Sequence, residues 1–121
     1  MPRQILDELL IHPAAREFVA GLNADIVREV QEAVAAHAVV VVGMRQNPMP
    51  KYARKVLDRE SIAYKYLEYG SYLSGWRRRT ALKMWTGWPT FPMVFVKGVL
   101  VGGAADLARL HASGELAKLL A

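Results

Sequence analysis

The 121-residue chain has the length of a single domain, and its hydrophobic fraction of 53% is too high for a disordered protein. It contains no cysteine, which excludes disulfides, thiolate metal sites and cysteine nucleophiles supplied by these residues. The net charge of +5 permits contact with anions, although surface charge of this size is also common in ordinary soluble domains.

Two stretches bear on membrane association and localisation. The longest uninterrupted apolar run, Ala38–Val42, is far shorter than the roughly 20 residues that a membrane-spanning helix needs. The N-terminal stretch MPRQILDELL mixes acids with leucines and has no apolar signal-peptide core. We therefore expect a cytoplasmic protein without membrane contact, whose oligomeric state the sequence does not indicate.

Residues 1–37 predict a helical extension made of two or three short helices. Leucines recur at helical spacing, and Pro13 interrupts the pattern because the residue before a proline resists the α conformation. A second break falls at Gly21–Asn23. These helices either cover an apolar rim of the following domain or leave that rim to a partner. The side chains that would need cover are Leu6, Leu9, Leu10 and Phe18.

From residue 38 the pattern changes to alternating strands and helices. The run 38–42 predicts a strand buried on both faces, and the prolines at 48 and 50 suit a helix start. The expected strands are 38–42, 62–68, 93–97 and 99–101, and the expected helices are 51–59, 76–85, 106–112 and 115–121. The order β-α-β-α-β-β-α is typical of an α/β protein with a thioredoxin-like fold, in which helices flank a four-stranded mixed sheet.

The segment GWPTFPMVFVKGVLVGG at 87–103, followed by LHASGELAKLL at 110–120, strongly resembles the C-terminal half of glutaredoxins. The Trp-Pro-Thr before an X-Pro turn is most similar to the monothiol branch of that family. The resemblance covers residues 38–120, which divides the chain into the helical extension of 1–37 and a glutaredoxin-like domain of 38–121. It implies glutathione-linked redox or iron–sulfur chemistry for the family.

The catalytic thiol that the resemblance implies is missing. Aligned with the monothiol pattern, Pro50 stands at the position of the family's cysteine, and aligned with the dithiol pattern, Asn47 does. Thiol–disulfide exchange proceeds by attack of a thiolate on sulfur, so no catalytic residue is expected here. The same substitution removes the cysteine with which monothiol glutaredoxins hold an iron–sulfur cluster, and we expect neither a metal site nor a cofactor.

The resemblance also implies the remainder of a glutathione groove. In the family, the residue before a cis-proline pairs its backbone with the bound tripeptide, which predicts a cis Phe91–Pro92 bond. A basic residue of the family aligns with Arg79, and a guanidinium suits a carboxylate. The free N–H groups of the helix that follows Gly103 favour a carboxylate as well. The expected groove residues are Arg79, Thr90, Phe91, Pro92, Gly102, Gly103 and Ala104.

Two charged contacts of the family are absent. Val42 stands where the family has a lysine, and Ala105 stands where it has an aspartate that holds the ligand's ammonium group. Asp106 is one residue late, which turns its side chain by about 100°, so we expect it to cap the helix or to face elsewhere. Arg45 and Tyr52 are weaker candidates for the rim. Two lost charged contacts, each typically worth about 1.5–3 kcal/mol, imply a weakening of glutathione binding by roughly 100-fold or more, or no binding.

Three functions remain open. The leading hypothesis is a redox-inactive binding or regulatory module whose degenerate groove takes a peptide, a thiol metabolite or a protein partner. The second is the family's role in glutathione-linked disulfide redox or iron–sulfur handling, with thiols supplied by a partner. The weakest is nucleic-acid contact through the basic cluster of Arg77–Arg79 and Lys83, which a solvated helix face explains better.

Overall fold

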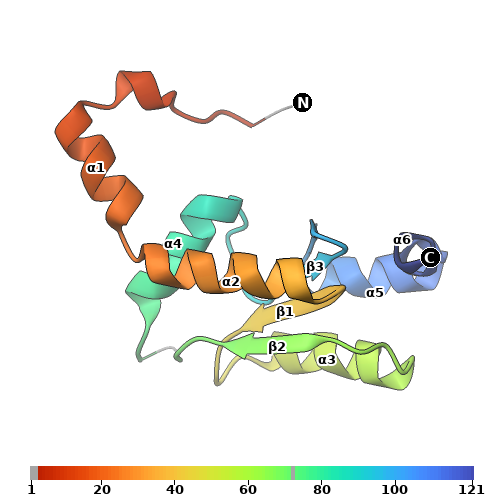
Figure 1. Cartoon of the computed structure of the whole chain (residues 1–121). Helices are drawn as coiled ribbons and strands as arrows, with labels where there is room; N and C mark the ends of the chain where they lie inside the picture. The colour runs from red at the N-terminus through yellow and green to blue at the C-terminus, as the bar shows by residue number, and fades with distance from the viewer. Residues whose placement is uncertain (1–2, 72) are drawn as a thin grey trace.

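The computed structural model describes residues 3–71 and 73–121. The helices are η1 (Glu8–Leu10, a 3-10 helix), α1 (Pro13–Gly21), α2 (Ala24–Ala36), α3 (Pro48–Arg59), α4 (Trp76–Thr86), α5 (Ala104–Ser113) and α6 (Glu115–Leu120). The strands are β1 (Val39–Gly43), β2 (Lys65–Glu68), β3 (Met93–Val96) and β4 (Val99–Gly102). Their order in the sheet is β2-β1-β3-β4, with β1 parallel to β2 and the other two pairs antiparallel (Figure 1). This is the thioredoxin-like fold with a mixed sheet that the sequence predicted.

Helices cover both faces of the sheet, which explains why β1 is buried along its whole length (Figure 1). Successive side chains of a strand point to opposite faces, so the four valines of β1 serve two cores. One core lies between the sheet and helices α2 and α4 and includes Ile26, Val30, Val40, Val42, Leu82, Met93 and Phe95. The other lies against α3, α5 and α6 and includes Val39, Val41, Leu57, Val94, Val96, Leu107 and Leu116.

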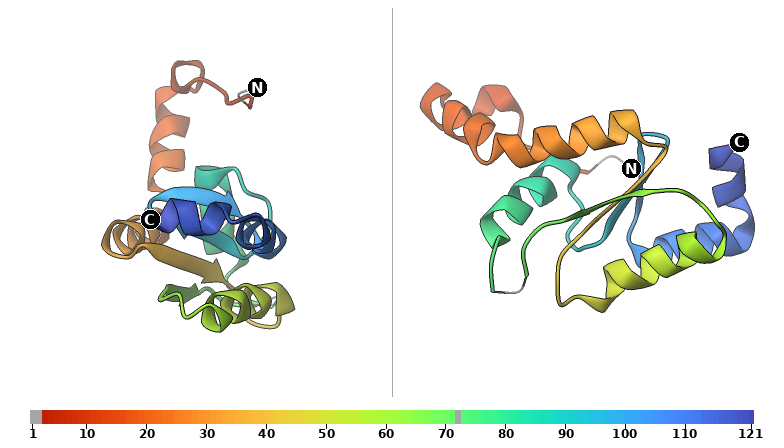
Figure 2. Two further views of the ribbon diagram at one scale, coloured as in Figure 1. Left: turned by 90° about the vertical axis from the view of Figure 1, so that its right-hand side faces the viewer. Right: turned by 60° about the horizontal axis from the view of Figure 1, so that its bottom comes forward.

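The helices of the N-terminal extension do not pack as one unit. Helix α2 belongs to the α/β body, because it buries Ile26 and Val30 against the sheet. Helices η1 and α1 bury no side chain and project from the outer end of α2, away from the sheet (Figures 1 and 2). Leu6, Leu9, Leu10 and Phe18 are therefore 63–80% exposed, and the alternative in which they cover the domain is wrong. Within the described residues, no helix combines the length and apolar composition that a membrane span requires.

Two tyrosines on or next to β2 have hydroxyl groups whose pKa is raised in the folded chain. The Tyr69 hydroxyl donates a 2.6 Å hydrogen bond to Glu29 Oε1, which fastens α2 to the end of β2. Burial and this hydrogen bond raise the pKa of Tyr69. Burial, with a hydrogen bond to Glu68, raises the pKa of Tyr66 to about 12. An unfolded tyrosine releases its proton at about pH 10, so over an alkaline range the folded chain binds more protons than the unfolded chain.

We expect the free energy of unfolding to decline as the pH rises above about 10. The stability contributed by the two raised pKa values is complete below that pH and is lost as the pH rises through the folded-state values. Urea unfolding at a series of pH values from about 9 to about 11 measures the decline. Tyr69→Phe should flatten it, whereas the exposed Tyr52→Phe should not. A free energy of unfolding that stays constant over this range in the natural chain would contradict the assignment.

Candidate functional site

The candidate site lies where the start of α3 meets the loop before β3. The Phe91–Pro92 peptide bond in this loop is cis, as expected. Asn47 caps α3, because the Met49 N–H donates a 2.9 Å hydrogen bond to its Oδ1 atom. The Nδ2 group of the same side chain donates to the Phe91 carbonyl oxygen at 3.2 Å. One amide side chain therefore joins the helix start to the cis-proline loop.

A groove of about 320 Å³ opens beside this junction. The first turn of α5, a ten-residue helix, forms one wall and presents its free N–H groups and the positive end of its dipole. Five of the expected groove residues come together here, and Gly102, which is buried at the end of β4, adjoins them through Gly103. The groove is lined by Asn47, Met49, Trp88, Thr90, Phe91, Pro92, Gly103, Ala104, Ala105 and Asp106.

Asp106 both caps α5 and lines the groove. Its Oδ2 atom accepts a 2.9 Å hydrogen bond from the Gly103 N–H, and its Oδ1 atom accepts one from Arg109 at 2.6 Å. The side chain of the third residue of a helix reaches back to the N-cap in this arrangement. The expected cap is present, and its geometry holds the carboxylate at the groove instead of turning it elsewhere.

The structure separates the two candidate positions of the missing thiol. Asn47 is the N-cap of α3 and lines the groove, whereas Pro50 is buried in the first turn of the helix. Pro50 packs against the end of β1 so closely that a Cβ atom at Gly43 would lie 2.7 Å from the Pro50 Cβ. A reactive thiolate needs access and the favourable field of a helix N-terminus. Of the two positions, only Asn47 lines the groove at the helix N-terminus.

Arg79 does not lie in the groove, and the role expected for it is not the one that the structure gives it. The side chain is buried, and its Nη1 group donates to the carbonyl oxygens of Tyr69 at 2.9 Å and Ser74 at 2.7 Å. Burial lowers the pKa of this guanidinium. Gly70, with a φ of +68°, leaves it room, since a Cβ there would lie 2.8 Å from Nη1. Arg79 closes the loop between β2 and α4 instead of binding a carboxylate.

The weaker candidates Arg45 and Tyr52 also lie outside the groove, on different sides of α3. Arg45 lines a separate hollow of about 430 Å³ together with Lys51, Arg54 and Lys55. Tyr52 is exposed and lines a smaller hollow of about 180 Å³ between α3 and α5. Neither side chain belongs to the surface around Phe91 and Pro92.

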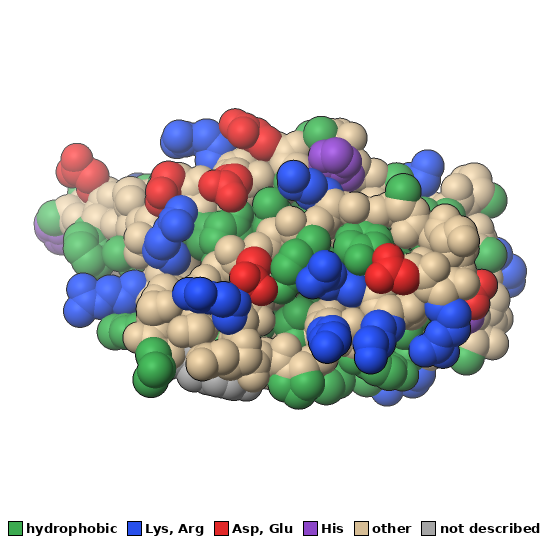
Figure 3. All heavy atoms as spheres, turned by 90° about the horizontal axis from the view of Figure 1, so that it is seen from below, with side chains coloured by type: hydrophobic (Ala, Val, Ile, Leu, Met, Phe, Trp, Pro, Cys, Tyr) green, Lys and Arg blue, Asp and Glu red, His purple; other side chains and the backbone are tan. Residues whose placement is uncertain are grey.

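The basic residues of α4 do not form one patch. Arg78 pairs with Asp25 of α2 at 3.2 Å, Arg77 lies 5.1 Å from the centre of the Trp76 ring, and Arg79 is buried. Lys and Arg side chains gather instead on the face formed by α3 and β2, as seen from below (Figure 3). The arrangement of these side chains therefore does not favour the hypothesis of nucleic-acid contact through Arg77–Arg79 and Lys83, which stays a prediction. Among the described residues, no three His, Asp or Glu side chains cluster as metal ligands would.

Comparison with known proteins decides the family. The family model described as Glutaredoxin matches residues 39–101, which run from β1 into β4 and include most of the groove. The chain belongs to the glutaredoxin family. Within this family it is a member whose 121 residues include no cysteine.

Relatives and solved structures agree with this assignment. A "Glutaredoxin-like protein" of Dictyostelium discoideum is 44% identical over 99 residues, which cover 82% of this chain and 80% of the relative. The crystal structure of oxidized glutaredoxin 2 from Chlamydomonas reinhardtii superimposes with a TM-score of 0.70 at 30% identity, covering 81% of this chain and 92% of that one. A buckwheat glutaredoxin–glutathione complex gives a TM-score of 0.73 at 25% identity, covering 82% and 90%.

Two groove residues have roles that the sequence does not predict. The resemblance places Asn47 only at a position of the family's cysteine, yet its amide joins α3 to the Phe91 carbonyl. The Asn-Pro pair at 47–48 was a usable signal, because asparagine favours the N-cap and proline the first helical position. Trp88 lines the groove, and its indole Nε1 is buried without a hydrogen-bond partner among the described residues. No local pattern indicates that position.

Proposed function

We propose that this glutaredoxin-family chain is a binding or regulatory module that performs no thiol–disulfide exchange with its own residues. The position of Asn47 carries this proposal. An amide stands at the N-terminus of α3, beside the cis-proline, and none of the 121 residues is cysteine. A carboxamide cannot attack a disulfide or form one. The cis-proline loop and the start of α5, which line the groove next to it, support a binding role.

The ligand class that we propose is an extended peptide or a peptide-like thiol metabolite such as glutathione. An extended backbone can pair with the residue before the cis-proline, here Phe91, in the manner of an added strand. The first turn of α5, from Ala104 onward, presents N–H groups that suit a carboxylate. The buckwheat relative solved as a glutathione complex supports this class of ligand.

Two internal contacts should make glutathione a weak ligand. The Asn47 Nδ2 group already donates to the Phe91 carbonyl oxygen, which an added strand would also use. Gly103 and Arg109 already donate to the Asp106 carboxylate. A ligand has to share or displace these hydrogen bonds, so part of its own binding free energy is offset.

The replacement Asn47→Ser should strengthen glutathione binding while lowering the free energy of unfolding by no more than the about 0.5–1.5 kcal/mol of one lost hydrogen bond. Serine caps a helix about as well as asparagine, but it lacks the Nδ2 donor, so the Phe91 carbonyl becomes available to the ligand. A hydrogen bond contributes about 0.5–1.5 kcal/mol, which corresponds to roughly a 2- to 10-fold gain in affinity. An NMR titration of both chains with glutathione measures the difference, and the shifts should concentrate at Thr90, Phe91, Gly103 and Ala104.

Asn23 provides a control for an asparagine replacement outside the groove, because it stands at the N-cap position of α2 and its side chain makes no cap hydrogen bond. Asn23→Ser should leave glutathione binding as it is in the natural chain. If Asn23→Ser and Asn47→Ser have the same effect, the Asn47–Phe91 bond is not what limits binding. If no chain shows groove shifts up to several millimolar glutathione, glutathione is not the ligand.

A further inference from the structure

The N-terminal arm, which we define as residues 5–21, leaves its large apolar side chains uncovered by its own chain. None of its side chains is buried, and Ile5, Leu6, Leu9, Leu10 and Phe18 are each more than 60% exposed. A nine-residue helix such as α1 is marginal in water without a packed face. The folded arm therefore calls for an apolar surface that the described body of the same chain does not supply.

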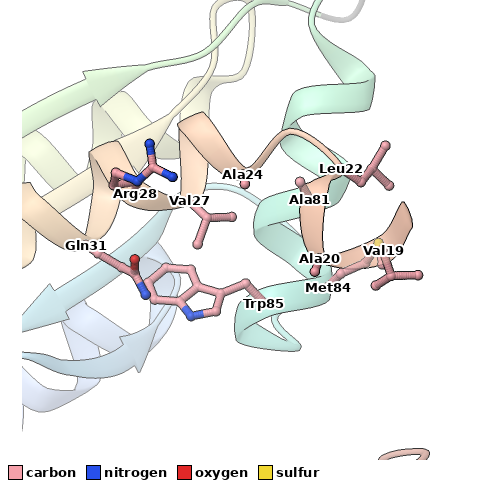
Figure 4. Close-up of a pocket in the computed structure, with 10 residues that line it drawn as sticks. All are labelled: Val19, Ala20, Leu22, Ala24, Val27, Arg28, Gln31, Ala81, Met84 and Trp85. Carbon is pink, nitrogen blue, oxygen red and sulfur yellow. The ribbon is translucent and has the colours of Figure 1, made fainter. Parts of the chain in front are cut away.

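An apolar hollow of about 380 Å³ lies between α1, α2 and α4 (Figure 4). The Trp85 ring extends along it towards Gln31, and Val27 points into it from α2 (Figure 4). Met84 and Trp85 from α4 remain 51% and 37% exposed. Of the residues that line the hollow, only Arg28 is charged. Exposed apolar surface of this kind with a polar rim is typical of a protein interaction site.

Segment 5–11 of the arm and the hollow are both largely apolar, and the charges that they carry are opposite in sign. The segment 5–11, ILDELLI, carries Asp7 and Glu8 and no basic residue, whereas the hollow carries Arg28 and no acid. Two arms packed on each other would bring like charges together, but an arm packed in a hollow brings opposite charges together. The charges thus favour contact between an arm and a hollow over contact between two arms.

The hollow cannot easily be filled by the arm of the same chain. Segment 5–11 joins α1 at Pro13, whereas Val19, Ala20 and Leu22 line the hollow from the other end of that helix. A helix of this length separates its ends by roughly 13 Å. Arg3 also lies against Gly87, at the end of α4, so segment 5–11 is held to the body on both sides. Its leucines nevertheless stay 63–80% exposed, which shows that the hollow of the same chain does not cover them.

We propose that the chain forms a symmetric homodimer in which segment 5–11 of each copy docks in the hollow of the other copy. A two-fold axis makes the interface isologous, so both arms and both hollows are buried together. Leu9 and Leu10 are the anchoring side chains, and Arg28 of the second copy pairs with Asp7 or Glu8. The dimer does not depend on a ligand in the groove, since the groove and the hollow share no lining residue.

The first test is the oligomeric state of the full chain, measured by sedimentation over a range of concentrations. We expect a dimer that dissociates on dilution, and Leu10→Glu should raise its dissociation constant roughly 10-fold or more. Leu119→Glu, at a half-exposed leucine of α6, is the control and should leave the constant unchanged. A natural chain that stays monomeric at all concentrations, or equal effects of the two variants, would overturn the proposal.

The second test uses the absence of native cysteine, which lets single introduced thiols report position. A tagged Leu9→Cys chain is mixed with an untagged Met84→Cys chain and treated with a short bis-maleimide. The arm–hollow contact predicts a crosslinked heterodimer, and the control pair Leu119→Cys with Met84→Cys should give little. Equal yields from both pairs, or crosslinking only within one chain of a Leu9→Cys/Met84→Cys double variant, would exclude arm exchange.

Discussion

Replacing Asn47 with cysteine should give this chain a glutathione-dependent disulfide-exchange activity that its natural sequence lacks. The thiol would stand at the N-cap of α3, beside the Phe91–Pro92 loop and within the groove. The pKa of a free cysteine thiol is about 8.5, and a helix N-terminus lowers it into the range of about 3.5–7.5. A large fraction of the introduced thiol should therefore be thiolate at neutral pH. Reduction of a mixed disulfide by glutathione measures turnover, and the pH dependence of alkylation measures the thiol pKa.

Pro50→Cys is the matched control for this experiment. Pro50 is buried against Gly43 and does not line the groove, so a thiol there should react slowly and give only background turnover. The natural chain should give none, because it has no thiol. An active Pro50→Cys with an inert Asn47→Cys would mean that Pro50 occupies the nucleophile position. Robust turnover by the natural chain would contradict the proposed function itself.

Replacing Arg79 with alanine should be among the most destabilising single substitutions in the chain. The buried guanidinium donates to the carbonyl oxygens of Tyr69 and Ser74, and both hydrogen bonds would be lost. Hydrogen bonds to a charged group are worth about 1.5–3 kcal/mol each, so we expect the two lost bonds to lower the free energy of unfolding by about 3–6 kcal/mol. Urea unfolding measures this loss. Arg79→Lys keeps the charge but loses the forked geometry of the guanidinium, so its free energy of unfolding should lie between those of the natural chain and Arg79→Ala.

Arg77→Ala controls for the removal of a basic residue from the same helix. Arg77 is exposed and contacts the Trp76 ring, so its loss should cost less than about 1 kcal/mol. The result also separates two roles of Arg79. If Arg79 bound a ligand carboxylate, its replacement would weaken glutathione binding and spare stability. The structure predicts the opposite for any variant that folds, since Arg79 lies outside the groove.

The Asn47→Cys and Arg79→Ala experiments together test which class of ligand the groove binds. An active Asn47→Cys would show that the natural chain lacks a thiol but retains an otherwise working glutaredoxin groove. That outcome would favour a ligand related to glutathione. An Asn47→Cys chain with a reactive thiol but no turnover would instead place the limitation in ligand binding, where the Asp106 carboxylate is already held by Gly103 and Arg109.

Most of the fold could be predicted because its signals are local. The valine run of β1, the hairpin at Lys97-Gly98 and the helix of residues 76–86 each follow from periodicity and turn chemistry within a short window. The errors fall at element ends. Helix α3 begins at Pro48 and not at residue 51, because Asn47 caps it, and β2 begins at Lys65, three residues later than expected. End positions depend on caps and neighbouring strands.

The candidate site was predicted only in part, and the reason is distance along the chain. Phe91, Pro92, Gly103 and Ala104 come together as expected, since they surround one short hairpin. The bond from Asn47 to Phe91 spans 44 positions, and nothing in the spacing of residues reports such a contact. The orientation of the Arg79 side chain also depends on contacts outside its own helix. The carbonyl oxygens of Tyr69 and Ser74 accept hydrogen bonds from it, and Gly70 and Gly75 leave room for it.

The sequence by itself determined the order of strands and helices, the glutaredoxin resemblance and the loss of the thiol, because these depend on residue identity and local pattern. Only the tertiary structure decided that Asn47 and not Pro50 stands at the groove, that Arg79 is structural, and that the N-terminal leucines are uncovered. Successive side chains of a helix differ in direction by about 100°, so an offset of one residue in an alignment places a side chain on a different face of the helix. Long-range packing then fixes which surroundings those are.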